Sequence, residues 1–177
     1  MIHKAWIGFM AFAVLSFVSG VAHAQLGSLF GRKASVPEIS VQELQQLLNE
    51  QQRAEEAFTG AEENKPVPSF LIVDVRSDKE LAVSIIPGAI TKAQYEKNRD
   101  QYRGRTVIPY CTIGGRSGAY AAQLQKAGVK TRNFKGSILE WVRADLPLVT
   151  LDGTPTNRVH TYSDRYRVPA KYEAVTK

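Results

Sequence analysis

A continuous apolar run at residues 70–75 constrains the fold more strongly than any other segment of this 177-residue chain. The run does not alternate between polar and apolar side chains, which is typical of a parallel strand buried on both faces. Two further strands are expected at residues 106–110 and 129–134. Strands that alternate with helical patterns predict an α/β fold, with a mostly parallel central sheet flanked by helices on both faces. The expected helices span residues 41–48, 92–101, 118–127 and 137–143, and residues 49–69 are expected to form a tail of the first helix followed by a surface loop.

Four residues support local predictions within this pattern. Ser40 and Glu43 have the spacing of a capping box, so the first helix is expected to begin directly after Ser40. Pro109 has no backbone N–H group and lies inside an expected strand, which predicts a bulge or a bend there. Trp141 lies in the last helical segment and is expected to pack in the core.

The N-terminus has the pattern of a secretory signal peptide. Residues 5–18 are apolar and follow a short basic start, and the small residues Ala22 and Ala24 mark a cleavage site before Gln25. The run is short for a membrane span. We therefore expect a periplasmic or secreted protein, with no stable membrane insertion after cleavage. The predicted organisation is a signal peptide at 1–24, a leader at 25–37, a domain at 38–149 and a C-terminal extension at 150–177.

Composition narrows the classes of function. The formal net charge is +6, but the basic residues are scattered along the chain without a block of lysine and arginine. We therefore expect no nucleic-acid partner. The chain has one cysteine, Cys111, so an exported form has no internal disulfide. The Cys111 thiol must then be buried and inert, bonded to another molecule, or used in chemistry.

Cys111 opens a glycine-rich loop between an expected strand and an expected helix. Backbone N–H groups and the positive end of the helix dipole converge at such a junction, which favours an anion and lowers the pKa of a thiol. Gly114 and Gly115 would allow the tight, partly left-handed path that this arrangement requires. The pattern predicts a nucleophilic cysteine rather than a small buried apolar side chain. The loop comprises Cys111, Thr112, Ile113, Gly114, Gly115, Arg116 and Ser117.

Four motifs give the chain a resemblance to the rhodanese-like domain family over residues 39–149. Each motif alone is weak, but the four occur together and in the family's order. The resemblance implies a rhodanese-like α/β domain. The motifs are Ile39-Ser40-x-x-Glu43-Leu44, then Asp74-Val75-Arg76 with Glu80 and Ile86-Pro87-Gly88-Ala89-Ile90, then Cys111-x-x-Gly114-x-Arg116-Ser117, and last Gly136-x-x-x-x-Trp141 with Leu146-Pro147-Leu148-Val149.

The resemblance implies sulfur transfer. In rhodanese-like enzymes a cysteine thiolate takes sulfur from a donor such as thiosulfate or a persulfide and becomes a cysteine persulfide. It then passes the sulfur to cyanide, a thiol or a protein acceptor. By this resemblance Cys111 is the nucleophile, the backbone N–H groups of residues 112–117 cradle it, and neither a metal nor a cofactor is expected. Arg116 would either contact the substrate or hold the loop closed.

Other residues are expected to have supporting or surface roles. Asp74, Arg76 and Glu80 are expected to form one ion-pair set that braces the neighbouring strand end. His160 lies in a polar stretch and is expected at the surface. The extension is rich in tyrosine, which is atypical of a disordered tail, so a strap across the domain is favoured over a partner-docking segment near the active site. Its tyrosines include Tyr162, Tyr166 and Tyr172.

Two other functions are weighed against sulfur transfer. A rhodanese-like module could bind a partner, or report sulfur or redox state through Cys111, without turnover. A cysteine phosphatase or an arsenate reductase is disfavoured, because such relatives place five residues between the cysteine and the arginine. Here four residues separate Cys111 from Arg116. Turnover with a small sulfur donor would separate catalysis from both alternatives.

Overall fold

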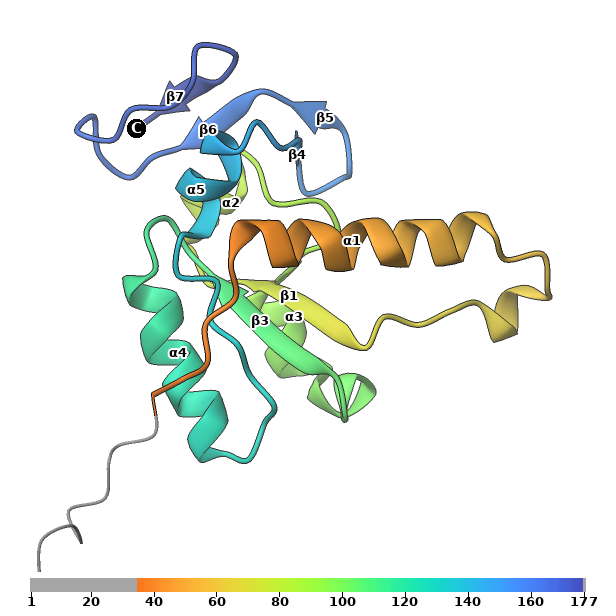
Figure 1. Ribbon diagram of the computed structural model, residues 1–177. Coiled ribbons are helices and arrows are strands. Elements are labelled where there is room, and N and C mark those ends of the chain that lie inside the picture. The colour runs from red at the N-terminus through yellow and green to blue at the C-terminus, as the bar shows by residue number, and fades with distance from the viewer. Residues whose placement is uncertain (1–34, 177) are drawn as a thin grey trace, which may run out of the picture. The chain divides into compact units, whose positions relative to one another are not determined.

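Three parallel strands form the central sheet, in the order β2–β1–β3. The two longer strands, β1 and β3, lie side by side in Figure 1. The computed structural model describes residues 35–176, so the signal peptide predicted at residues 1–24 lies outside the described residues. The central strand β1 (Phe70–Asp74) pairs in parallel with β2 (Ile90–Thr91) and with β3 (Thr106–Tyr110). All five residues of β1 are buried, as the apolar run predicts.

Side chains of β1 alternate between two hydrophobic cores, one on each face of the sheet. Phe70 and Ile72 belong to the first core, whereas Leu71 and Val73 belong to the second. Helices cover both faces, which confirms the predicted α/β architecture. The helices at the first core are α1 (Val41–Glu56) and α5 (Ser137–Arg143), and those at the second are α3 (Lys92–Lys97) and α4 (Gly115–Lys126).

The predicted capping box of α1 is confirmed. The Glu43 backbone N–H donates to the Ser40 hydroxyl, and the Ser40 backbone N–H donates to the Glu43 carboxylate at 3.0 Å. The helix continues past residue 48 to Glu56, which confirms the tail expected there. Three glutamine side chains each donate to a glutamate one turn later, which supports this exposed second half. The pairs are Gln46–Glu50, Gln51–Glu55 and Gln52–Glu56.

The helix predicted at residues 92–101 is divided into two short elements. α3 ends before Asn98, whose φ of −115° is not helical, and the 3-10 helix η2 (Arg99–Tyr102) follows. Two short helical elements were not predicted from the sequence. They are the 3-10 helix η1 (Glu62–Asn64) and the one-turn helix α2 (Asp78–Leu81).

The segment predicted as a strand at residues 129–134 joins the sheet through one isolated bridge and a few backbone hydrogen bonds. Thr131 bridges Val107 of β3 in parallel, and the Phe134 N–H donates to the Pro109 carbonyl oxygen at 3.1 Å. Pro109 has no N–H group to offer this segment, which interrupts the pairing. The bulge predicted at Pro109 is wrong, because β3 keeps a continuous register with β1 on its other side.

The C-terminal extension folds onto the domain beside α5 (blue in Figure 1). Val159 and Tyr172 both belong to the core that contains α5. His160 is 7% exposed, so the prediction of a surface histidine is wrong. Strand pairing within the extension explains the burial of His160. Within the extension, β6 (Arg158–His160) is parallel to β7 (Glu173–Val175). The strand β5 (Pro155–Thr156) is antiparallel to β4 (Leu148–Val149), which lies just before the extension.

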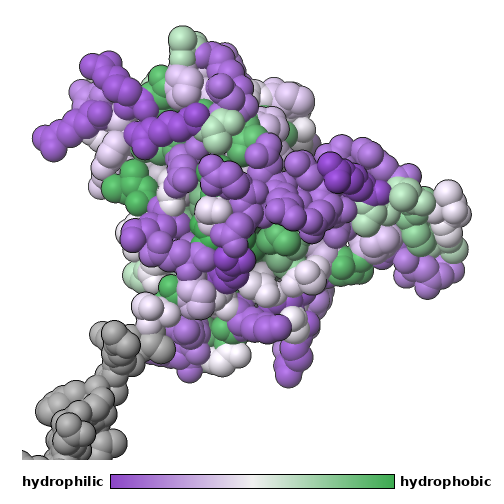
Figure 2. All heavy atoms as spheres, viewed as in Figure 1, coloured by the Kyte–Doolittle hydropathy of each residue, from purple (hydrophilic) through white to green (hydrophobic). Residues whose placement is uncertain are grey.

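The face shown in Figure 2 is mostly hydrophilic, and its hydrophobic residues lie in small separate groups. Trp141, by contrast, is 2% exposed and packs in the core, as predicted. Its indole N–H donates to the Pro147 carbonyl oxygen at 2.7 Å, which satisfies the buried polar atom. Within residues 35–176, every helix is too short or too polar to cross a bilayer.

Candidate active site

Cys111 lies directly after β3, at the carboxyl edge of the central sheet, and its loop leads into α4. The first turn of α5 holds the Cys111 backbone on both sides. The Cys111 N–H donates to the Ser137 hydroxyl at 3.0 Å, and the Ile138 N–H donates to the Cys111 carbonyl oxygen at 3.1 Å. Ligands of open α/β sheets bind at this edge, where helix N-termini converge.

The Cys111 sulfur is surrounded by hydrogen-bond donors. The Gly114 N–H donates to Sγ at 3.1 Å. Burial raises the pKa of the thiol, but hydrogen bonds from the Ser117 and Ile113 backbones, the Ser117 hydroxyl and the Gly114 backbone outweigh burial and lower it below its ordinary value. These donors stabilise the thiolate, which is the reactive form of cysteine. Of the residues 112–117 expected to cradle the sulfur, Ile113, Gly114 and Ser117 donate to it.

The two loop glycines have different roles. Gly114 has a φ of +96°, and a Cβ there would overlap the Lys135 carbonyl oxygen. Gly115 is the first residue of α4 and does not have a positive φ, so the left-handed path depends on Gly114 alone. The expectation that both glycines provide conformational freedom is therefore wrong for Gly115.

Arg116 is held by a glutamate from a distant part of the chain. Its guanidinium makes two hydrogen bonds of 2.7 Å to the Glu80 carboxylate and one of 2.8 Å to the Thr112 hydroxyl. The Thr112 hydroxyl donates to Glu80 at 2.6 Å. Burial raises the pKa of Glu80, but hydrogen bonds from Arg116, Thr112 and Ser77 lower it well below its ordinary range. An ionised Glu80 thus holds Arg116 and the loop together.

The predicted ion-pair set is divided into two parts. Asp74 and Arg76 form a buried pair at 2.7 Å, in which both side chains are almost fully inaccessible to solvent. Arg76 also donates to the Ser84 carbonyl oxygen, so this pair braces the end of β1 against the following turn. Glu80 instead pairs with Arg116, as described above. The prediction of one set is wrong, because Glu80 lies in α2 and faces the cysteine loop.

A cavity of about 240 Å³ opens above the Cys111 loop. Ile113 is 52% exposed at this site, whereas Cys111 is 1% exposed and Thr112 is buried. Two residues of the C-terminal extension complete the wall. They are Tyr162, which is 68% exposed, and Tyr166, which also packs against the core.

Sequence reasoning missed three residues of the site: Ser137, Tyr162 and Tyr166. Ser137 has a φ of +56°, unusual for a non-glycine residue, and its hydroxyl lies 3.8 Å from the Cys111 sulfur. Ser137 directly follows Gly136 of the last motif, and this position could have indicated a turn with unusual backbone angles. The tyrosine-rich composition of the extension was a signal for packing, but it carried no information on the cysteine.

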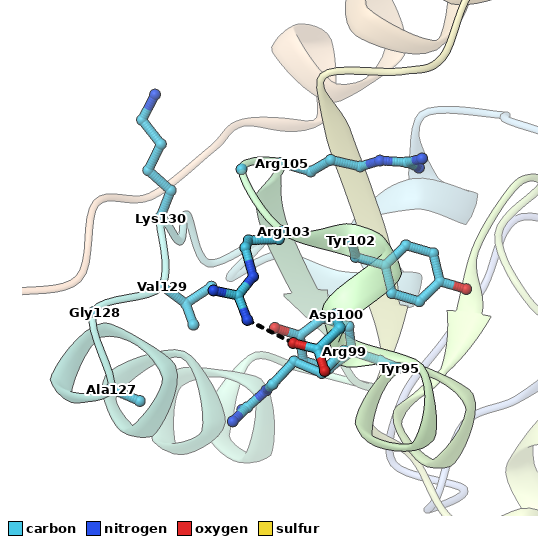
Figure 3. A pocket seen from close by; sticks show the side chains of 11 residues that line it. Tyr95, Arg99, Asp100, Tyr102, Arg103, Arg105, Ala127, Gly128, Val129 and Lys130 are labelled. Atoms are coloured by element: carbon cyan, nitrogen blue, oxygen red, sulfur yellow. Dashed lines mark hydrogen bonds and ion pairs between the residues drawn. The ribbon is translucent and has the colours of Figure 1, made fainter.

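A second hollow, of about 430 Å³, lies at the opposite end of β3 (Figure 3). It is strongly basic, but its cations do not converge. The Arg103 guanidinium points to Asp100 and pairs with it at 2.7 Å, while the side chains of Lys130 and Arg105 extend in different directions. This hollow shares no lining residue with the cavity at Cys111 and is separate from that site.

Comparison with known proteins identifies the family that this chain resembles. The model of the rhodanese-like domain matches residues 40–144. A sulfurtransferase of Allochromatium vinosum is 33% identical over 93 residues, which cover 47% of this chain and 81% of the relative. A tRNA sulfurtransferase of Desulfurococcus amylolyticus is 35% identical over 89 residues, covering 49% of this chain but 18% of the relative. A solved rhodanese-related protein of Thermoplasma volcanium is 19% identical, with a TM-score of 0.48, and the match covers 64% of this chain and 97% of that chain.

The fold and the cysteine loop define an α/β domain with a thiolate site at the carboxyl edge of its sheet. The chain belongs to the rhodanese-like domain family, whose model matches more than half of its length. This confirms the resemblance identified from the four motifs. The relatives of this chain include proteins named sulfurtransferases.

Replacement of Ser117 by alanine should shift the reactivity of Cys111 to higher pH. The change removes a hydroxyl that lowers the pKa of the thiol, so a smaller fraction of thiolate is present at a given pH. The measurement is the rate of iodoacetamide alkylation as a function of pH. Ser84→Ala is the matched control, because Ser84 is buried and its hydroxyl has no partner among the described residues. An equal shift in both variants would contradict the assignment.

Proposed function

We propose that this protein is a sulfurtransferase that carries sulfane sulfur on Cys111, from a donor such as thiosulfate or a persulfide to a thiophilic acceptor. The observation that supports it most directly is the Cys111 thiol, whose pKa is lowered by the donors around Sγ and which faces a cavity. Nucleophilic catalysis needs such an activated thiolate beside room for a substrate.

In the first step, the Cys111 thiolate attacks the outer sulfur of the donor. A bond forms between Sγ and that sulfur, while the sulfur–sulfur bond of the donor breaks and the leaving group takes its electron pair. With thiosulfate the leaving group is sulfite, and with an organic persulfide it is a thiolate. The role of the loop is to hold negative charge throughout this exchange, because backbone N–H groups stabilise a thiolate and a persulfide anion alike.

In the second step, an acceptor attacks the terminal sulfur of the Cys111 persulfide. The bond between Sγ and the terminal sulfur breaks, and the Cys111 thiolate is restored. Cyanide would leave as thiocyanate, and a thiol would leave as a persulfide. The same N–H groups that favour the initial thiolate make it a good leaving group, because a thiol of lower pKa leaves faster.

The Allochromatium vinosum relative, which the match covers over most of its length, supports sulfur transfer as the reaction class. The match to the tRNA sulfurtransferase covers less than a fifth of that relative, so tRNA is not part of the proposal. We also propose export through the signal peptide at residues 1–24. N-terminal sequencing of the periplasmic protein should then begin at Gln25, and an intact Met1 would contradict export.

Repeated turnover separates an enzyme from a binding or sensing module. Purified protein should convert cyanide to thiocyanate over many cycles with a sulfane-sulfur donor, and Cys111→Ser should abolish the product. A module that only captures sulfur or a partner would give at most one equivalent per chain. Reduced, accessible Cys111 with no turnover from thiosulfate or an organic persulfide would contradict the enzymatic proposal.

A further inference from the structure

The cavity wall beside Cys111 contains two aromatic residues from outside the matched family segment. Tyr162 and Tyr166 come from the C-terminal extension, whereas the family model ends at residue 144. The other lining residues belong to the cysteine loop. The extension therefore gives this chain a pocket wall that the matched domain does not supply.

Several interactions hold Tyr162 in place. Its φ is +65°, and its backbone N–H donates to His160 Nδ1 at 3.0 Å. Thr161, just before it, is fully buried and its N–H donates to the Val175 carbonyl oxygen at 2.9 Å. A non-glycine residue keeps a positive φ only where its surroundings enforce it, and such residues concentrate at functional sites. The exposed Tyr162 ring is thus presented from a fixed backbone.

The charges around the cavity cancel. Arg116 is paired bidentately with the ionised Glu80, and its guanidinium also lies 5.7 Å from the centre of the Tyr162 ring. Burial lowers the pKa of the nearby His160, which keeps its ring neutral at pH 7. The loop N–H groups therefore attract negative charge beside an Arg116 whose own charge is shared with Glu80. Among the described residues that line the cavity, the cation is Arg116, and its charge is already paired with Glu80, so the second charge of a small dianion such as thiosulfate would meet no unpaired cation there.

The size and polarity of the cavity favour a larger, apolar substituent. Its volume of about 240 Å³ corresponds to roughly eight water molecules at ~30 Å³ each. Ile113, Tyr162 and Tyr166 line it, and two of these three side chains are more than half exposed and available for contact. Aromatic rings at such a position bind flat or apolar groups through dispersion and stacking.

We propose that Tyr162 and Tyr166 select a sulfur donor whose transferable sulfur is carried by an apolar organic group, in preference to inorganic thiosulfate. This inference rests on the proposed sulfurtransferase function and narrows its donor class. For an organic persulfide, the Cys111 thiolate bonds to the outer sulfur, the donor sulfur–sulfur bond breaks, and the organic thiolate leaves with that electron pair. No net oxidation or reduction is required.

Three stable sulfur donors distinguish the effect of the donor's charge from the effect of its apolar group on the rate of sulfur transfer. Methanethiosulfonate and benzenethiosulfonate carry one negative charge and the same reacting group, whereas thiosulfate carries two charges and no organic group. Each thiosulfonate transfers its outer sulfur to the Cys111 thiolate and leaves as the corresponding sulfinate. The measurement is kcat/KM for each donor with cyanide as acceptor. The wild type should use benzenethiosulfonate best and thiosulfate worst.

Substitution of Tyr162 tests the aromatic wall. Tyr162→Ala should lower the ratio of kcat/KM for benzenethiosulfonate over methanethiosulfonate by roughly 2- to 10-fold, the range expected for one aromatic contact. Tyr162→Phe should keep the ratio, and Tyr166→Leu, which retains apolar packing, should lower it. Leu151→Ala is the control, because Leu151 is an exposed apolar residue of the extension that does not line the cavity.

The outcomes are distinct. An unchanged ratio in Tyr162→Ala, or faster use of thiosulfate than of methanethiosulfonate by the wild type, would overturn the inference while leaving sulfur transfer intact. Failure of all three donors to load Cys111 would instead overturn the proposed function on which the inference depends. The predicted result is that the ratio of kcat/KM for benzenethiosulfonate over methanethiosulfonate falls in Tyr162→Ala and Tyr166→Leu. The same ratio should stay unchanged in Tyr162→Phe and Leu151→Ala.

Discussion

Gly114→Ala should reduce sulfur transfer by roughly 100-fold, the loss expected when a reacting group is displaced by about 1 Å. The new Cβ would overlap the Lys135 carbonyl oxygen, and the residue would have to keep a φ of +96°. Relief of that overlap would move the Gly114 N–H away from the Cys111 sulfur. The measurements are kcat/KM with cyanide as acceptor and the pH dependence of Cys111 alkylation.

A matched glycine separates backbone strain from the overlap. Gly104 has a φ of +87°, but a Cβ there meets no atom within 4 Å, and it lies at the other end of β3. Gly104→Ala should cost about 1–2 kcal/mol of stability, which is the strain of a left-handed residue, and should leave activity unchanged. Similar activity in the two alanine variants would contradict the role of Gly114.

Asp74→Asn should destabilise the domain by about 3–5 kcal/mol, as expected when one partner of a buried ion pair is removed. The Arg76 side chain has no exposed surface, and its Nη1 already has no hydrogen-bond partner among the described residues. Loss of the Asp74 charge would leave a buried cation uncompensated. Urea unfolding at pH 7 measures the change in the free energy of unfolding.

An exposed pair provides the control for this prediction. Glu173 and Arg158 lie 3.3 Å apart, and both side chains are more than half exposed. Glu173→Gln should change the free energy of unfolding by no more than about 1 kcal/mol. The double change Asp74→Asn with Arg76→Met should recover part of the loss, because it removes the stranded charge. A loss below about 1 kcal/mol in Asp74→Asn alone would contradict the structural role of the pair.

Local sequence patterns predicted the parts of the fold that depend on neighbouring residues. The capping box at Ser40 and Glu43 acts over three positions, and the apolar run of β1 reflects burial of each residue in turn. The junction of a strand, a glycine-rich loop and a helix likewise placed Cys111 at the sheet edge. These predictions succeeded because one short segment contains both the pattern and its physical cause.

Long-range contacts account for what the sequence could not predict. Glu80 and Arg116 are 36 positions apart, and the spacing of Asp74, Arg76 and Glu80 favoured a local ion-pair set instead. The burial of His160 depends on the pairing of β6 with β7, which no short sequence motif predicts. In the same way, only the tertiary fold brings Tyr162 to the cysteine loop. The donor-selecting wall is therefore a property of the folded chain.

The most direct test of the account is the intact mass of the protein after incubation with a sulfane-sulfur donor. Reduced protein should gain one sulfur atom on Cys111, lose it when cyanide or a thiol is added, and accept it again on a second exposure to the donor. Cys111→Ser should gain none. A wild-type mass that stays unchanged with every donor, while Cys111 reacts readily with iodoacetamide, would contradict sulfur transfer through this thiolate.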